Sequence, residues 1–403
     1  MKQKIMYIHH GGAVGGAGIS CYNTAKMLAK HYEVVTYCYD KPMDIANVIA
    51  AEGITSKTYS TALGTIPHFN GGPEVFSLRF YKGILYILVF AKKWLRIIKE
   101  ESPDVLIVNS KLLCWYSVLA KMLDIKCICY IRETAVTGGK GVWNSIIQRF
   151  LEKCDGVFFI SEYDRQIENL KVPFTCVIPN FLSPESYTSS LSKQEACDKI
   201  GVRSDTFNIL YVGGISKPKG FDIAVEALRF LCDKPTSLIV AGRGFDIVSK
   251  QKNLIKQFRY TFSERRYVES MKELLDDTYL AENVHFIGVR QDMADVYAAC
   301  DVLVFPARDA HQARPAFEIG MQKKPVIISD YEMTREYVRD GINGLTFEPF
   351  NPEHLATAIR RLMDDNQLYS KLGENNYLQT MAQHTNMQAE ILLNANIEKV
   401  LNS

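Results

Sequence analysis

The sequence has few features of a zinc-binding, secreted or nucleic-acid-binding protein. Its ten cysteines include no Cys-x-x-Cys pair and no Cys/His cluster with the spacing of a zinc site. The formal net charge is only +2, from 47 basic and 45 acidic residues, so no strong basic field is present to attract nucleic acid. Only about five apolar residues precede His9, too few for the core of a signal peptide. These absences predict a cytoplasmic protein with reduced thiols and no nucleic-acid partner.

Long apolar runs are also missing. In the segment 75–100 the longest uncharged run extends from Gly83 to Ala91, which is shorter than a membrane-spanning helix requires. On a helical wheel, basic residues lie on one side (Arg79, Lys82, Lys92, Lys93, Arg96 and Lys99) and apolar residues on the other (Ile84, Ile87, Ala91, Trp94 and Ile98). The helix is therefore either a surface helix packed on a sheet or a face that contacts an anionic membrane from its inner side.

Short segments rich in Val, Ile and Tyr alternate with helix-length segments along most of the 403 residues. The expected strands are KIMYIHH, EVVTYCYD, DVLIVNS, IKCICYIRE and DGVFFIS, followed by FNILYVGG, SLIVAGRG, VHFIGV, DVLVFPA and PVIISD. Such alternation predicts parallel sheets with helices on both faces, and the length suits two domains. We therefore expect an α/β protein with doubly wound domains over residues 1–182 and 205–380, joined by a Ser- and Pro-rich linker over 183–204.

The first strand leads into "HHGGAVGGAGIS", which contains five glycines. A glycine loop between a strand and a helix can hold a phosphate group. The dinucleotide fingerprint needs glycine at its first, third and sixth positions, and the nearest match is Gly11, Ala13 and Gly16. Asp40 ends the second strand, about where an acid would bind a ribose hydroxyl. An NAD- or FAD-dependent enzyme and a loop without a ligand both stay open as alternatives.

In the second half, "YVGGISKPKGFDIAVEAL" places Lys219 directly before a helix. An ammonium group there can bind a diphosphate and stabilise the charge of a leaving group, although a solvated surface lysine fits the same position. The segments "LIVAGRG", "VHFIGVRQ" and "HQARPAFEIGMQKKPVI" follow in order. From Asn208 to Pro349, and in the Gly-Gly loop, the chain resembles the family-four retaining glycosyltransferases of the GT-B type, the glycosyl transferases group 1.

The resemblance implies two Rossmann-like domains that face a central cleft, an N-terminal acceptor domain and a C-terminal donor domain. It also implies a C-terminal helix, residues 381–403, that returns to the first domain. The implied reaction is the retaining transfer of a sugar from a UDP- or GDP-linked donor to a glycan or a polyprenyl-diphosphate-linked acceptor, in cell-surface polysaccharide or glycoconjugate assembly. No Asp-x-Asp set follows a strand, so neither a metal nor another cofactor is expected.

The family motifs fall on individual residues of this chain. Lys219 matches the lysine that binds the donor diphosphate and acts on the leaving group, and Glu318 matches the glutamate that binds the ribose. The other residues implied in donor binding are Gly15 and Gly16 near the phosphate, Gly213 and Gly214 before Lys219, Val289 and Arg290 beside the base, and Arg314 near the diphosphate.

Two positions depart from the family pattern. Gly214 stands where the family has a second diphosphate cation, for which Arg308, Arg314 or Arg243 could substitute. Ala310 stands where a first glutamate contacts the sugar, and Asp309 or His311 could take that role.

Arg132 and Glu133 stand where the family commonly has a histidine. They are expected either to orient the acceptor or the donor sugar as catalytic residues, or to form a buried ion pair. These departures leave open a catalytically weakened protein that binds nucleotide or glycan as a partner subunit.

Overall fold

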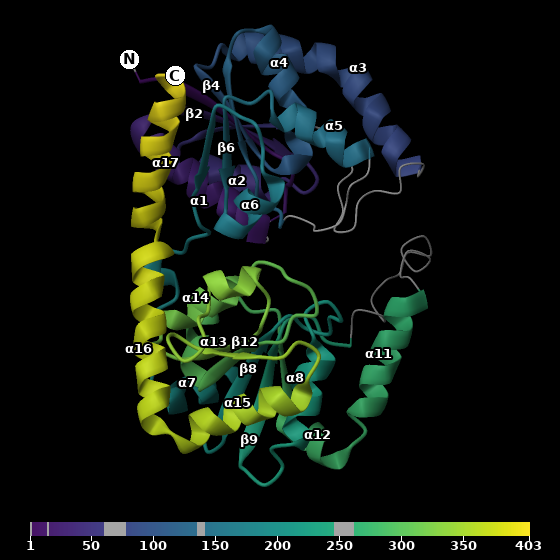
Figure 1. Cartoon of the computed structure of the whole chain (residues 1–403), viewed down its shortest axis with the longest axis vertical. Helices are drawn as coiled ribbons and strands as arrows, with labels where there is room; N and C mark the ends of the chain where they lie inside the picture. Colours follow the sequence, from purple (N-terminus) through teal and green to yellow (C-terminus); the bar gives the residue numbers. More distant parts are fainter. Residues whose placement is uncertain (1, 14–15, 60–77, 135–141, 246–261) are drawn as a thin grey trace. The chain divides into compact units, whose positions relative to one another are not determined.

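The computed structural model describes residues 2–13, 16–59, 78–134, 142–245 and 262–403, and the chain divides into two compact units (Figure 1). Unit 1 contains Met1–Phe181 together with Asn386–Ser403, and unit 2 contains Leu182–Thr385. The segment 183–204, expected to be a linker, therefore lies within unit 2. Its helix α7 (Lys193–Ile200) begins with a capping box of Ser192 and Glu195 and packs beside α13 (Met293–Ala299).

Unit 1 is built on a parallel sheet in which the strands lie in the order β3-β2-β1-β4-β5-β6-β7. The strands are β1 (Lys4–His9), β2 (Glu33–Tyr39), β3 (Thr55–Tyr59), β4 (Val105–Asn109), β5 (Lys126–Tyr130), β6 (Gly156–Phe159) and β7 (Phe174–Val177). Successive side chains of a strand point to opposite faces. Met6 and Ile8 thus enter one buried cluster, while Ile5 and Tyr7 enter the other.

Helices cover both faces of this sheet. One cluster includes side chains of α3 (Leu78–Glu101), α4 (Tyr116–Met122) and α5 (Val142–Leu151), and the other includes side chains of α1 (Gly16–His31), α2 (Asp44–Ala51) and α17 (Asn386–Leu401). The short helix α6 (Glu162–Glu168) contacts β6 and β7. The amphipathic segment near residues 75–100 is thus a helix whose Trp94 and Ile98 are buried against the sheet.

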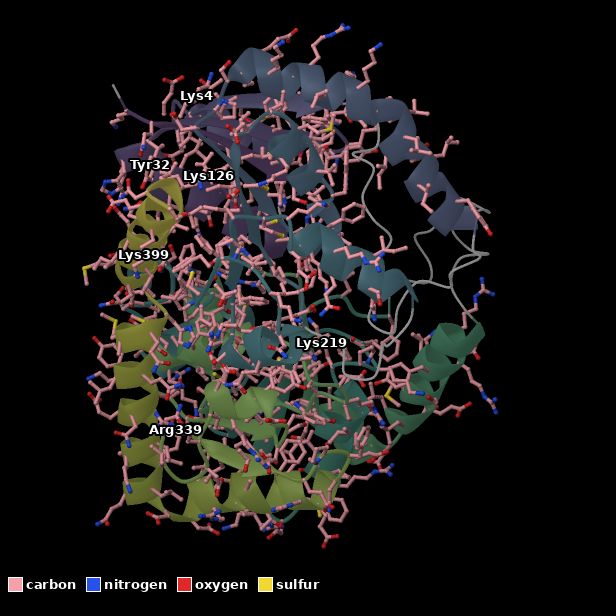
Figure 2. The ribbon with its side chains drawn as sticks, turned by 45° about the horizontal axis from the view of Figure 1, so that its top comes forward. Lys4, Tyr32, Lys126, Lys219, Arg339 and Lys399 are labelled. Carbon is pink, nitrogen blue, oxygen red and sulfur yellow. The ribbon has the colours of Figure 1, made fainter. Side chains whose placement is uncertain are left out.

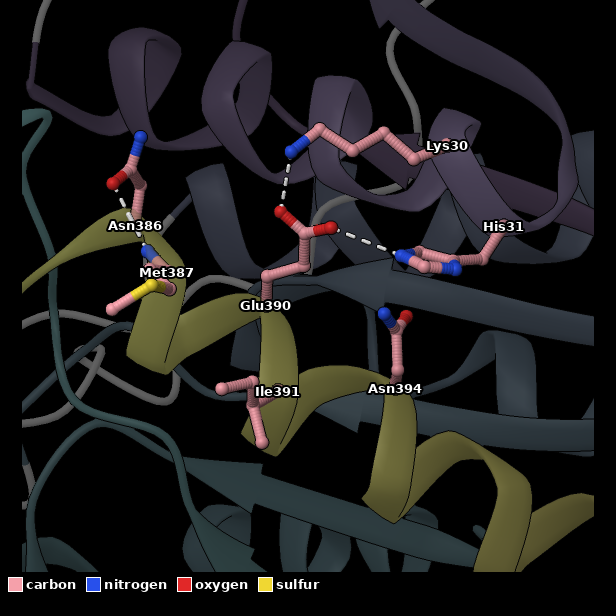
Figure 3. Close-up of a pocket in the computed structure, with 7 residues that line it drawn as sticks. All are labelled: Lys30, His31, Asn386, Met387, Glu390, Ile391 and Asn394. Carbon is pink, nitrogen blue, oxygen red and sulfur yellow. Dashed lines mark hydrogen bonds and ion pairs between the residues drawn. The ribbon is translucent and has the colours of Figure 1, made fainter.

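The last helix of the chain, α17, is attached to α1 by an ion-paired cluster (Figure 3). Glu390 accepts from Lys30 Nζ at 2.5 Å and lies 2.9 Å from His31 Nε2, beside a pocket of about 320 Å³. Burial alone would raise the pKa of the Glu390 carboxyl, but the hydrogen bonds from Lys30 and His31 outweigh burial and lower it. The cluster therefore stabilises the fold at neutral pH, and this contribution is lost as the pH falls through the lowered pKa.

Unit 2 contains a second parallel sheet, in the order β10-β9-β8-β11-β12-β13. The strands are β8 (Phe207–Val212), β9 (Thr236–Ala241), β10 (Val284–Gly288), β11 (Val302–Phe305), β12 (Val326–Ser329) and β13 (Leu345–Phe347). One face packs on α8 (Phe221–Arg229), α11 (Phe262–Leu274), α12 (Thr278–Asn283) and α15 (Pro352–Asp364). The opposite face packs on α7, α13 and α14 (Arg314–Gly320), and α16 (Asn366–Gln383) packs on α14.

Both sheets reverse their strand order in the middle, between β1 and β4 in unit 1 and between β8 and β11 in unit 2. Loops that leave the carboxyl ends of such strand pairs diverge to opposite faces, and this point is where doubly wound sheets bind ligands. The structure confirms the predicted α/β class. The loops that follow β8 and β11 are therefore the expected position of a ligand site in unit 2.

Candidate nucleotide site

The glycine pair after β8 lies against the end of β9. Both backbone N–H groups, of Gly213 and Gly214, donate to Ala241 O, at 2.8 and 3.0 Å. Gly214 has φ +61°, and a Cβ there would lie 2.4 Å from Arg243 O. No side chain fits at position 214 without moving this backbone, so only glycine suits the turn.

The loop that carries Lys219 packs on the loop that follows β11. Gly220 has φ +74°, and a Cβ there would lie 1.7 Å from Pro306 O, so the two backbones are in direct contact. Arg308 N donates to Pro218 O at 2.9 Å, which joins the loops a second time. Lys219 is therefore fixed at the point where the strand order of unit 2 reverses, just before α8.

A pocket of about 400 Å³ opens beside Lys219. Its wall is formed by three basic residues and by glycine and apolar residues: Lys219, Arg243, Arg290, Gly213, Gly242, Val212, Ile215, Ala241, Val289 and Met293. No carboxylate is among these residues. A pocket whose described lining residues include three basic side chains and no acid is suited to a polyanion.

The Lys219 side chain is partly buried, and burial lowers the pKa of its ammonium group. No ion pair of Lys219 occurs within the described parts of the chain. A Cβ at Gly213 would lie 2.7 Å from Lys219 Cδ, so the missing side chain leaves room for the lysine stem. Among the described residues, this cation of the pocket wall thus has no carboxylate partner.

Two further predicted residues line the same pocket. Val289 is 69% exposed, and it follows β10 directly. Arg290 is ion-paired with Asp292, with Nε 2.8 Å from Oδ1. The structure therefore brings together Gly213, Lys219, Val289 and Arg290, while Gly214 supports the pocket through its backbone.

Glu318 lies on α14 outside this pocket wall and is only 6% exposed. Its Oε1 accepts from Arg314 Nε at 2.6 Å, and its Oε2 accepts from the Tyr297 hydroxyl at 2.6 Å. Burial opposes the charge of Arg314, but Glu318 outweighs it and raises the pKa of the guanidinium. These two predicted donor residues thus form an ion pair with each other, in which the carboxylate is buried and the guanidinium is 22% exposed.

Asp309 and His311 follow β11 and lie close to each other. His311 Nδ1 is 2.9 Å from Asp309 O, and the imidazole packs 4.9 Å from the Phe305 ring. Burial lowers the pKa of His311, and the positive charge of Lys219 lowers it further. His311 is therefore in the electrostatic field of the pocket lysine and is biased toward its neutral form.

In unit 1 the predicted Arg132 lies just after β5. Its guanidinium donates to Asn109 Oδ1 at 3.0 Å, to Asn180 Oδ1 at 3.3 Å and to Thr24 Oγ1 at 2.9 Å, and it stacks 3.6 Å from the Tyr130 ring centroid. All three of these acceptors are neutral.

The Glu133 carboxylate accepts instead from the Ser110 hydroxyl and from the backbone N–H groups of Lys111 and Arg132, and it does not bind the Arg132 guanidinium. The interpretation of Arg132 and Glu133 as a buried ion pair is therefore wrong, because each side chain binds different partners.

The sequence prediction missed His9, the last residue of β1. It is 1% exposed, its Nδ1 lies 3.1 Å from Asn109 Nδ2, and its Nε2 has no hydrogen-bond partner among the described residues. Burial lowers the pKa of His9 to about 3, and His10 and Arg132 lower it as well. The neutral imidazole and Arg132 both contact Asn109, at the point where the strand order of unit 1 reverses. The two adjacent histidines at the end of the first strand were the signal available in the sequence.

Of the two loop glycines predicted to approach the donor phosphate in unit 1, only Gly16 is among the described residues. Gly15 lies outside the described residues. Gly16 begins α1 with no atom within 4 Å of its Cβ position, so packing does not require glycine there.

Within the described residues, no group of three or more His, Cys, Asp or Glu side chains could hold a metal ion. No helix in those same parts has both the length and the apolar composition needed to cross a membrane.

Solved structures share this arrangement of two doubly wound sheets. The UDP complex of Anabaena Alr3699/HepE matches with a TM-score of 0.79 over 98% of this chain and 100% of that chain, at 18% identity. A glycosyltransferase from Rickettsia africae ESF-5 matches with a TM-score of 0.77 over 99% of both chains, also at 18% identity. At such identities the similarity establishes the fold alone, and that fold is the GT-B fold of glycosyltransferases.

Family models cover most of the chain. The model of Glycosyltransferase Family 4 matches residues 14–186, and that of Glycosyl transferases group 1 matches residues 192–379. The chain therefore belongs to the family-four glycosyltransferases of the GT-B type, which confirms the resemblance found in its motifs. This membership favours glycosyl transfer over the alternative of an NAD- or FAD-dependent enzyme.

Proteins of similar sequence are also described as glycosyltransferases. The glycosyltransferase MJ1178 of Methanocaldococcus jannaschii is 25% identical over 375 residues, which is 90% of this chain and 88% of that protein. MJ1607 of the same organism is 24% identical over 47% of this chain and 45% of its own length. The lipopolysaccharide glucosyltransferase WaaG of Escherichia coli is 23% identical over 54% of each protein. The chain thus matches about half the length of MJ1607 and WaaG.

Proposed function

We propose that the protein is a retaining glycosyltransferase that uses a UDP- or GDP-linked sugar and acts in cell-surface polysaccharide or glycoconjugate assembly. The observation that carries this proposal is the cationic pocket around Lys219, at the reversal point of the unit 2 sheet. Relatives described as WaaG, a lipopolysaccharide glucosyltransferase, and as a poly(glycerol-phosphate) alpha-glucosyltransferase of Bacillus subtilis support the pathway class. A HepE structure described as a UDP-glucose complex supports the donor class.

In this proposal residues 205–380 bind the donor. Lys219 binds the diphosphate and stabilises the negative charge that develops on the diphosphate as it leaves. A cation that is fixed in position before the reaction stabilises such charge effectively. Val289 and Arg290 flank the base, Glu318 accepts hydrogen bonds from the ribose, and Asp309 or His311 contacts the sugar. With these groups the leaving diphosphate needs no metal ion. Attack and departure occur on the same face of the sugar, and the diphosphate helps to accept the proton.

Residues 1–182 bind the acceptor, a glycan or a polyprenyl-diphosphate-linked sugar. Arg132 has guanidinium contacts only to neutral acceptors among the described residues, so its charge is available to orient an acceptor or a donor oxygen. His9 lies in the same hydrogen-bonded group, and its lowered pKa makes the imidazole too weak a base to take up a proton near physiological pH, so it serves as a hydrogen-bond donor. Glu133 supports this group through the Ser110 loop.

A binding series tests the donor class. UDP, GDP, ADP and NAD are each added to the protein, and the melting temperature is recorded. We expect UDP or GDP to raise it, because a ligand that binds only the folded state stabilises it. Hydrolysis of the matching nucleotide sugar is then measured. Stabilisation by NAD alone would contradict the proposal, and nucleotide binding without any turnover would support the alternative of a catalytically weakened partner subunit.

We also propose that α3 contacts an anionic membrane at the inner, cytoplasmic side. Beyond its buried face, α3 exposes large apolar side chains in its N-terminal half: Tyr81 (52%), Leu85 (59%), Leu88 (72%) and Val89 (58%). Lys92, Lys93 and Arg96 are exposed farther along, without an ion pair among the described residues. An apolar patch followed by basic residues suits the interface of an anionic bilayer. Arg79 and Lys82 belong to the predicted basic face, but their side chains lie outside the described residues.

Flotation with vesicles of anionic lipid tests this contact. Each basic residue near such a surface contributes about 1 kcal/mol, so reversing Lys92, Lys93 and Arg96 to Glu is expected to lower partitioning at least about 100-fold. The matched control reverses three exposed lysines outside α3: Lys41, Lys153 and Lys171. Equal binding of the two triple variants, or no binding by the unaltered protein, would refute the membrane contact.

A further inference from the structure

A nucleotide sugar presents two phosphates to its site, and the departing diphosphate gains further negative charge. Lys219 supplies one compact positive charge. The loops around the pocket contain four arginines that could supply a second: Arg243, Arg290, Arg308 and Arg314. The ion pairs of these side chains show which of them is available.

Three of the four arginines already bind a carboxylate. Arg308 binds Asp222 through its Nη2 group, Arg314 Nε lies 2.6 Å from Glu318 Oε1, and Arg290 Nε lies 2.8 Å from Asp292 Oδ1. Arg243 is exposed and has no ion pair in the described parts of the chain. It lines the pocket together with Lys219. Of these four arginines, Arg243 is therefore the one without a carboxylate partner among the described residues.

Backbone contacts hold Arg243 next to the Lys219 loop. Ile215 N donates to Arg243 O at 3.0 Å, and a Cβ at Gly214 would lie 2.5 Å from Arg243 N. A Cβ at Gly242 would in turn lie 2.4 Å from Gly214 N. The loops after β8 and β9 thus touch through glycines on both sides. Position 214 has no room for a cationic side chain, and the β9 loop that fills this space places Arg243 beside it.

We infer that Arg243 binds the donor diphosphate together with Lys219, as the second cation of the site. The inference rests on the proposed nucleotide-sugar function and names a residue for it. A guanidinium presents paired N–H donors that match two phosphate oxygens, so Arg243 spans the diphosphate where Lys219 holds a single point. The site consequently discriminates a nucleoside diphosphate from the nucleoside.

Isothermal titration calorimetry tests this assignment with UDP, GDP, ADP and uridine. For the diphosphate that binds the unaltered protein, Arg243→Ala is expected to lower the affinity about tenfold. Arg243→Glu is expected to lower it further, and Arg243→Lys to retain most of it. If uridine binds, its affinity is expected to be the same in all variants, because it has no phosphate. The salt dependence of diphosphate binding is expected to weaken in Arg243→Ala.

The matched control is Arg339→Ala. Arg339 is an exposed arginine of the same unit that lies away from Lys219 (Figure 2). Absence of any diphosphate binding by the unaltered protein would overturn the proposed function. Normal diphosphate binding by Arg243→Ala, together with weakened binding by Lys219→Met, would overturn the role of Arg243 alone.

Discussion

Lys219→Met is expected to lower affinity for the nucleoside diphosphate about 10- to 100-fold and turnover about 100- to 1000-fold. The methionine keeps the shape of the stem beside Gly213 and removes the charge that faces the pocket. Because the ammonium has no ion pair among the described residues and burial disfavours its charge, its removal leaves no partner unsatisfied. The melting temperature of the free protein is therefore expected to stay the same or to rise.

The control for this variant is Lys217→Met, two residues earlier in the same loop. Lys217 is exposed and does not line the pocket, so its variant is expected to bind and turn over normally. Equal losses in both variants would mean that the loop's general charge, and not Lys219, attracts the nucleotide.

The lowered pKa of Lys219 also gives the site a pH dependence. Burial favours the neutral amine, so the ammonium of the free protein loses its proton at a lower pH than an ordinary lysine. Diphosphate affinity is therefore expected to decrease as the pH rises through that range. Lys219→Arg keeps its charge at those pH values, and its affinity is expected to stay flat. A decrease of the same size in Lys219→Arg would assign the effect to another group.

The interior of both sheets could be predicted from sequence because buried parallel strands are almost continuously apolar. β4 is buried along its whole length, and β1 along all but its first residue. The three strands without a clear signal are β3, β7 and β13, and each lies at the edge of its sheet. β3 has the sequence TSKTY with one buried side chain, and β13 has three residues. Edge strands have one neighbour and little buried area, so their composition stays close to that of a loop.

The site was only partly predictable, for a geometric reason. Gly213 and Lys219 lie in one loop directly after a strand. Their positions could therefore be predicted from their spacing in the sequence alone. The Arg314–Glu318 pair follows from helix geometry, because residues i and i+4 share one face.

Which arginine is left without a carboxylate depends on contacts between distant segments, such as Arg308 with Asp222. Arg132 and Glu133 are consecutive residues after a strand. Consecutive side chains in extended chain point to opposite sides, which disfavours an ion pair between them.

Glu318→Ala is expected to lower the stability of unit 2, in addition to any effect on nucleotide affinity. The carboxylate is the buried partner of Arg314 and the acceptor of the Tyr297 hydroxyl. Removing one member of a buried ion pair costs about 3–5 kcal/mol because a buried charge is left alone, and the 22% exposure of the Arg314 side chain places this pair at the lower end, about 3 kcal/mol. For a domain near this size, that loss corresponds to a decrease in melting temperature of roughly 6–12 °C. Weaker nucleotide binding by this variant would therefore not by itself show that Glu318 touches the ribose.

A compensated variant separates the two roles of Glu318. Combining Glu318→Leu with Arg314→Met and Tyr297→Phe removes the charge, its partner and the hydroxyl together, and apolar replacement of a buried pair is often close to neutral for stability. We expect this triple variant to recover most of the melting temperature lost in Glu318→Ala, while its nucleotide affinity stays at least about tenfold below that of the unaltered protein. The control pair, Arg314→Met with Tyr297→Phe, keeps Glu318 and is expected to bind nucleotide better than the triple variant. Full nucleotide affinity in the triple variant would limit Glu318 to holding α14 in place.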